Sequence, residues 1–136
     1  SYSLLPLVRH AAPLMLSGGS VVAMTFDASK RVYPGYNVMG TAKAALEHSV
    51  RQLAYEFGEQ RVRVNAISAG PLQTLAARGI SGFRAMHHNA ADKAPMKRNI
   101  TIEEVSQTAL FLCSDLSSGI TGATIPVDAG YHIMAV

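Results

Sequence analysis

The sequence predicts an α/β fold with parallel strands. Segments whose apolar residues recur at helical spacing alternate with short, nearly continuous apolar runs. Such runs are typical of strands covered on both faces of a parallel sheet, and their alternation with helices favours right-handed crossovers. Apolar residues make up 49% of the 136 residues and charged residues only 15%, so the chain can bury the core of one domain.

The composition excludes several other classes of protein. The 11 Gly, 6 Pro and 1 Cys are too few for a collagen-like, low-complexity or disulfide-rich chain. The net charge of +3 comes from scattered basic residues, so no nucleic acid partner is expected. No apolar run approaches the ~18 residues of a membrane span, and no secretory signal pattern is present. We therefore expect a cytoplasmic protein that spans no membrane.

The first part of the chain is predicted to form a helix, a strand and a second helix. Apolar residues recur at helical spacing over residues 2–16 and again over 37–57. The segment between them opens with the apolar run SVVAMTF at 20–26, which predicts a strand. Residues 27–35 are polar and end in Pro-Gly, which indicates a loop.

The middle of the chain is predicted to contain one strand and a less regular segment. Residues 62–68 read VRVNAIS and predict a strand, which Ala-Gly-Pro at 69–71 ends. Residues 75–98 show few clean periods and predict a loop with one or two short helices.

The last part is predicted to form a helix and a short strand. Thr101 and Glu104 have the spacing of a capping box, so a helix should begin there and run to about Ser114. Cys113 is expected on the buried face of this helix. Residues 123–127 (ATIPV) predict a strand, although Pro126 removes one donor from its ladder.

Two residues near the start of the second helix could act together in catalysis. Lys43 follows Tyr36 by seven positions, and at about 3.6 residues per turn both should lie on one helix face. A nearby cation stabilises a phenolate, and a lysine can donate several hydrogen bonds to a diol. The pair could therefore polarise a carbonyl and hold a ribose. The same spacing also fits a tyrosine at a helix start and a lysine on a solvated face.

Other motifs with known chemistry are missing from the sequence. It contains no G-x-G-x-x-G or G-x4-G-K-[ST] phosphate loop. Its five His residues include the pair His87-His88, but no H-E-x-x-H or paired C-x-x-C pattern accompanies them. No metal site is expected.

The segments YNVMGTAKAALE at 36–47 and RVNAISAGP at 63–71 resemble bacterial enoyl-acyl-carrier-protein reductases of the short-chain dehydrogenase/reductase superfamily. Most of that superfamily has three residues between its active-site Tyr and Lys, whereas this branch has six, as between Tyr36 and Lys43. The similarity covers essentially the whole chain and continues through 74–77, 79–80, 83–84, 94–95, 101–105, 111–116 and 127–130.

The resemblance implies a fold and a domain organisation. It predicts that residues 1–136 form a single partial domain, the C-terminal, catalytic half of a doubly wound parallel-sheet Rossmann domain. The N-terminal dinucleotide-binding half, with its Gly-rich phosphate loop, is expected to lie outside this sequence.

The resemblance also implies a reaction. Hydride would pass from NADH, or alternatively NADPH, to the double bond of a trans-2-enoyl thioester on acyl carrier protein in fatty acid biosynthesis. Tyr36 would hydrogen-bond the thioester oxygen and stabilise the enolate. Lys43 would bind the nicotinamide ribose hydroxyls.

Further site residues follow from the same resemblance. Gly70, Pro71, Leu72 and Thr74 would contact the cofactor together with Lys43. The acyl pocket would be lined by Phe26, Met39, Ala76, Ile80, Phe83 and Met86. Phe26 stands where many members have a second active-site tyrosine, so a mechanism that needs two phenols is not expected.

In this superfamily, helices that match residues 2–16 and 37–57 pack against partner subunits, which implies a homotetramer when the protein is complete. Two alternatives remain at this point. One is another short-chain reductase that acts on a carbonyl, against which the Tyr-Lys spacing argues. The other is a catalytically incomplete fragment or partner subunit, for which the missing phosphate loop argues.

Overall fold

A computed structural model describes residues 1–75, 77–80 and 82–135, and it confirms the α/β class with a parallel sheet. The sheet has three strands in the order β1 (Gly19–Thr25), β2 (Val62–Ala69) and β3 (Thr124–Val127). Both pairings are parallel, with Ala23 opposite Ala66 and Ile67 opposite Ile125. The carboxyl ends of the strands therefore meet at one edge, where open α/β sheets hold their sites.

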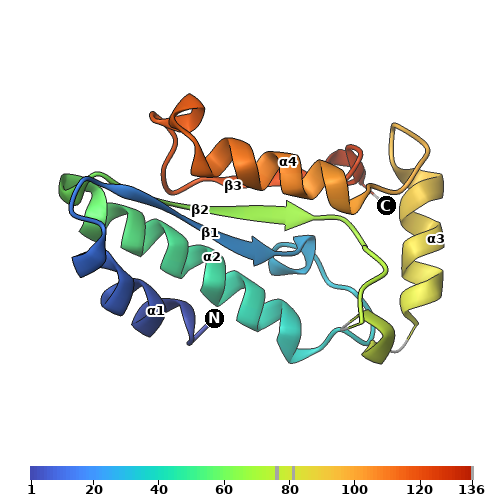
Figure 1. The fold of residues 1–136 in the computed structure, drawn as a ribbon. Coiled ribbons are helices and arrows are strands. Elements are labelled where there is room, and N and C mark those ends of the chain that lie inside the picture. The colour runs from blue at the N-terminus through green and yellow to red at the C-terminus, as the bar shows by residue number, and fades with distance from the viewer. Residues whose placement is uncertain (76, 81, 136) are drawn as a thin grey trace.

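Helices cover both faces of this sheet (Figure 1). The helices α1 (Leu4–Ala11) and α2 (Val38–Phe57) lie on one face, and α4 (Ile102–Cys113) lies on the other. The helix α3 (Phe83–Lys93) stands beyond the carboxyl ends of the strands. This arrangement gives three layers and brings α2 and α3 to the same edge of the sheet.

The core has two parts, one on each face of β2. Val62 and Val64 pack with Val50 of α2, and all three are almost completely buried. On the opposite face, Ile67 packs with Leu112 of α4. This two-sided burial explains why β2 has so few exposed side chains along its length.

The ends of the predicted elements differ in places from the structure. The first helix ends at Ala11, and a short 3-10 turn over Ala12–Leu14 follows it because Pro13 has no backbone N–H to continue the α-helix. The less regular segment holds a 3-10 turn at Ala77–Gly79 and α3, in agreement with the prediction of short helices. The prediction for Cys113 was wrong, because this residue is exposed.

The capping box of α4 is confirmed. The Thr101 side chain accepts a hydrogen bond from the Glu104 N–H at 3.3 Å, and Glu104 Oε2 accepts from the Thr101 N–H at 2.8 Å. Arg98 donates to both carboxylate oxygens of Glu104. Its guanidinium holds the pKa of Glu104 at about 2, so the cap stays ionised at neutral pH. Over the described ranges, none of the helices is both long and apolar enough to cross a membrane.

Candidate active site

A cavity of about 750 Å³ opens at the carboxyl ends of β1 and β2, between the N-terminus of α2 and α3. We call it the first cavity. It brings together predicted site residues from four separate segments of the chain: Phe26, Tyr36, Met39, Lys43, Gly70, Pro71, Leu72, Thr74, Ile80, Phe83 and Met86. Ala76, predicted for the acyl pocket, lies outside the described residues. These segments converge because the loops that follow parallel strands lie at the same edge of the sheet.

Tyr36 lies in the turn before α2 and not on the helix itself. The expectation that it shares a helix face with Lys43 is corrected in this respect. The turn is held by hydrogen bonds from Tyr36 N to Tyr33 O at 3.0 Å and from Met39 N to Tyr36 O at 3.1 Å. It reverses at Asn37, whose φ of 47° is unusual for a residue with a side chain. The turn still directs Tyr36 into the first cavity beside Lys43.

Burial favours the protonated form of the Tyr36 phenol. Desolvation raises its pKa above the ordinary value of 10.0, because a buried phenolate loses its hydration. At neutral pH the side chain is therefore a neutral hydrogen-bond donor. Its ring lies against Phe26, with centroids 5.3 Å apart, so the phenol is held on an apolar wall.

The Lys43 ammonium is held by one hydrogen bond within the protein and also faces the first cavity. Its Nζ donates to the Met24 carbonyl at the end of β1 at 3.0 Å. Desolvation lowers the pKa of Lys43 below the ordinary 10.5. An ammonium group has more than one N–H, so donors remain for a diol within the first cavity. The chemistry of this donor fits a ribose.

The loop after β2 presents polar groups to the same cavity. Gly70 packs tightly, because a Cβ there would lie 3.3 Å from Cα of Asp128. Pro71 has no N–H, so Leu72 supplies the first free backbone donor of the loop. The Thr74 hydroxyl accepts from Ala77 N at 3.2 Å, which leaves its own proton to donate to an oxygen of a ligand.

A buried carboxylate supports this site, and the sequence analysis missed it. Glu47 on α2 is 4% exposed, and its Oε1 accepts hydrogen bonds from Thr25 at 2.9 Å and Ser29 at 2.6 Å. These bonds tie the end of β1 and the following 3-10 turn to α2. The available signal was an acidic residue next to the apolar stripe that includes Leu46 and Val50.

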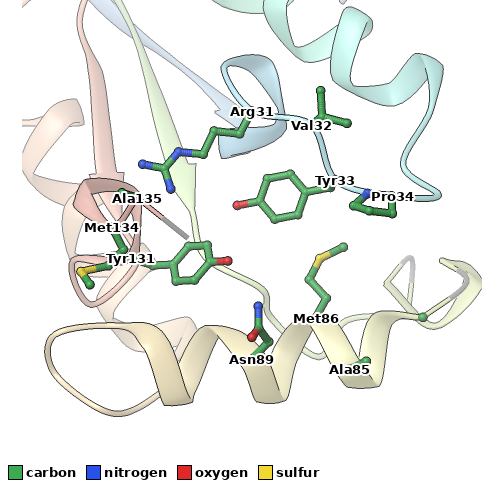
Figure 2. Close-up of a pocket in the computed structure, with 11 residues that line it drawn as sticks. Arg31, Val32, Tyr33, Pro34, Ala85, Met86, Asn89, Tyr131, Met134 and Ala135 are labelled. Atoms are coloured by element: carbon green, nitrogen blue, oxygen red, sulfur yellow. The ribbon is translucent and has the colours of Figure 1, made fainter.

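A second cavity, of about 890 Å³, adjoins the first and was also missed (Figure 2). Its lining comes from the loop before α2, from α3 and from the C-terminal segment: Arg31, Val32, Tyr33, Pro34, Gly82, Ala85, Met86, Asn89, Tyr131, Met134 and Ala135. The Tyr33 hydroxyl donates to Asp27 Oδ2 at 3.1 Å. Burial, followed by the Asp27 carboxylate, raises the pKa of Tyr33, so this phenol also stays protonated.

The described residues contain no group of three or more His, Cys, Asp or Glu side chains that could hold a metal ion. His132 instead contacts the Asp128 carboxylate at 3.0 Å, and His88 pairs with Asp92 at 3.2 Å.

Comparison with known proteins links the whole chain to one family. The family model described as enoyl-(acyl carrier protein) reductase matches residues 1–132. The NADH-dependent enoyl-acyl-carrier-protein reductase FabI of Synechocystis sp. is 53% identical over 136 residues, which are 100% of this chain and 53% of that protein. FabI of Bacillus subtilis is 50% identical over 99% of this chain and 52% of its own length.

Solved structures show the same relationship. The enoyl-acyl carrier protein reductase of Bacillus cereus, in a complex with NADP+ and indole naphthyridinone, matches with a TM-score of 0.97 and 46% identity over 100% of this chain and 53% of that chain. The Anaplasma phagocytophilum reductase, solved with NAD, matches with a TM-score of 0.94 and 47% identity over 99% of this chain and 52% of its own. The present chain spans about half the length of the curated relatives that it matches.

Proposed function

Because the chain belongs to the enoyl-(acyl carrier protein) reductase family, we propose that it takes part, in the cytoplasm, in the NADH-dependent reduction of trans-2-enoyl thioesters on acyl carrier protein. The observation that carries this proposal is the convergence of Tyr36, Lys43 and the 70–74 loop on one cavity. The remainder of that lining is mainly apolar, which suits an acyl chain.

Tyr36 acts as the hydrogen-bond donor to the thioester carbonyl oxygen. Negative charge develops on this oxygen when hydride reaches the β-carbon, and the resulting enolate needs a donor at that position. The raised pKa keeps the phenol protonated, so it can donate before and during the step. Phe26 offers no second hydroxyl, so one phenol serves the carbonyl in this mechanism.

Lys43 orients the cofactor, which supplies the hydride when it is bound. The remaining N–H groups of Lys43 would donate to the ribose hydroxyls, while the bond to the Met24 carbonyl holds the ammonium in place. The Leu72 backbone would hold the nicotinamide carboxamide, and the Thr74 hydroxyl would donate to a pyrophosphate oxygen. NADPH is the alternative coenzyme.

The apolar lining of the first cavity holds the acyl chain. It is formed by Met39 of α2, by Phe83 and Met86 of α3, by Ile80 in the segment between β2 and α3, and by Phe26, which follows β1. We assign these residues, with Ala76, to substrate binding.

We further propose that residues 1–136 are the catalytic half of a Rossmann domain and that the complete protein is a homotetramer. The coverage of about half of each relative and the lack of a Gly-rich phosphate loop in the sequence support the first part. Exposed apolar side chains on α1 and α2 support the second.

The proposal is tested by NADH oxidation with a short trans-2-enoyl thioester. Tyr36→Phe removes the donor to the enolate and should lower turnover by about 10²–10³-fold. Tyr55→Phe makes the same chemical change at an 84% exposed position on α2 and should leave turnover unchanged. Equal rates for the two variants would contradict the role of Tyr36. Turnover of a keto thioester in place of the enoyl thioester would favour a carbonyl reductase.

A further inference from the structure

We propose that the second cavity receives the distal end of a long acyl chain, and that Met86 closes the passage to it from the first cavity. This inference rests on the proposed function, since it concerns the same thioester substrate. It adds a binding site for the tail and a residue that determines chain-length selectivity.

Met86 lies between the two cavities. It lines the first cavity together with Ile80 and Phe83, and it also lines the second. Figure 2 shows its side chain rising from α3 toward the ring of Tyr33. Met86 is half-buried, and its unbranched thioether can change rotamer more easily than a branched or aromatic side chain. It can therefore close the passage for short chains and move aside for long ones.

An aromatic wall runs from one cavity to the other. The Phe26 ring lies 5.3 Å from the ring of Tyr36 and 4.9 Å from the ring of Tyr33, measured between centroids. Tyr36 lines the first cavity and Tyr33 the second. An acyl chain whose thioester is bound at Tyr36 thus has a continuous apolar surface that leads past Met86.

Two polar side chains of the second cavity, Tyr33 and Arg31, already have partners within the protein. The Tyr33 hydroxyl donates to Asp27, and Arg31 pairs with the same carboxylate at 3.4 Å. Arg31 also donates to the His132 carbonyl. An apolar tail that covers these two side chains would leave their bonds intact, so burying them would not incur the usual cost of burying unpaired polar atoms. Val32, Pro34, Ala85 and Met134 add apolar atoms to the lining, and Asn89 adds an amide.

Binding of saturated acyl-pantetheine thioesters with butanoyl, octanoyl and hexadecanoyl chains tests the proposal by calorimetry without a hydride step. Each newly buried methylene should raise affinity about threefold to fourfold. In the wild-type chain, the increase in affinity per methylene should be smaller for those methylenes that must displace the Met86 side chain. Met86→Ala opens the passage and should raise the hexadecanoyl-to-butanoyl affinity ratio by at least about tenfold.

Two further variants separate the tail site from the first cavity. Ala85→Phe fills the second cavity from an exposed position on α3 and should lower hexadecanoyl affinity about tenfold while leaving butanoyl affinity unchanged. Met39→Ala makes the same chemical change as Met86→Ala, but Met39 lines the first cavity and not the second. It should therefore lower affinity equally for all three chain lengths.

Three results would overturn the proposal: a Met86→Ala effect that is equal at every length, unchanged hexadecanoyl affinity in Ala85→Phe, or no binding of any of the three thioesters by the wild-type chain. The proposed function is judged separately, by turnover of a short enoyl thioester. If a short enoyl thioester is turned over but the Met86→Ala effect is the same at every chain length, the tail site is contradicted and the proposed function is not.

Discussion

Burial acts in opposite directions on the two residues at the centre of the candidate site. It raises the pKa of Tyr36 from 10.0 and lowers that of Lys43 from 10.5. In both cases burial favours the neutral form of the side chain, because a charged group loses more hydration free energy than a neutral one. As pH rises, Lys43 therefore loses its proton earlier than a free lysine, and Tyr36 keeps its proton longer than a free tyrosine.

We therefore expect deprotonation of Lys43 to cause the fall in NADH affinity at alkaline pH. If only the charged ammonium binds the ribose, NADH affinity should fall by up to about tenfold per pH unit above the Lys43 pKa, which lies below 10.5. Lys43→Arg keeps its charge in this range and should shift the fall to higher pH. Tyr36→Phe should leave the fall in place. NADH fluorescence titrations between neutral pH and pH ~10 measure it; a fall that disappears in Tyr36→Phe would assign it to the phenol instead.

The family resemblance assigned Tyr36, Lys43 and Thr74 to one site, and the three residues line one cavity in the structure. The parallel topology explains this, because the segments that follow β1 and β2 meet at the carboxyl edge of the sheet. The roles of Glu47 and Tyr33 depend on partners 22 and 6 positions away, and local spacing does not specify these pairs. Cys113 was assigned to the wrong face because apolar character alone does not distinguish the two sides of a mostly apolar helix.

At the scale of elements, one glycine fixes how closely α2 approaches the turn that follows β1. A Cβ on Gly40 would lie 2.8 Å from the carbonyl oxygen of Ala28 in the 3-10 turn Asp27–Ser29. This turn follows Phe26 directly, and Gly40 lies in the first turn of α2, four residues after Tyr36. The close contact therefore helps to set the distance between the Phe26 and Tyr36 rings.

Gly40→Ala should destabilise the fold by about 1–3 kcal/mol, because a backbone carbonyl has little room to move away from the added methyl group. This cost exceeds the gain of up to about 1 kcal/mol that alanine brings to a helix. Gly58→Ala is the matched control, since its φ of −61° suits alanine and no atom lies within 4 Å of the added Cβ. It should be neutral or stabilising by about 0.4–1 kcal/mol. Urea unfolding compares the two; equal stabilities would contradict the close-contact argument.

Element boundaries were predictable where a local signal marks them. The capping box at Thr101 located the start of α4, and the apolar run located β1 to within one residue. The start of α2 was also located to within one residue, because the helix predicted over 37–57 begins at Val38. The sequence analysis did not predict that Tyr36 lies in the turn before α2 or that Asn37 has a positive φ. The rings of Tyr33 and Tyr36 in this turn both contact Phe26, a packing that local spacing does not specify.

For the whole molecule, the main feature is an apolar surface that the chain does not cover itself. On the helical side of the sheet, Leu7 of α1 and Leu14 in the 3-10 turn that follows α1 are 66% and 84% exposed. The strand β1 also stands at an edge of the three-stranded sheet, where its backbone groups can pair with another strand. Both features favour association with a further polypeptide.

We expect the chain to self-associate through this α1–α2 side, and two leucines allow a direct test. The double substitution Leu7→Glu and Leu14→Glu places charge on side chains that are already in solvent, so it should cost the folded monomer little, within about 0.5 kcal/mol per site. In an interface the same carboxylates would be buried without partners, so association should weaken by about tenfold or more. Leu116→Glu is the matched control, because Leu116 is also 84% exposed but follows α4 on the opposite face of the sheet. Sedimentation velocity over a range of concentrations should show a shift toward monomer for the double variant alone. Equal weakening by Leu116→Glu would instead assign association to the α4 side or to nonspecific apolar contact.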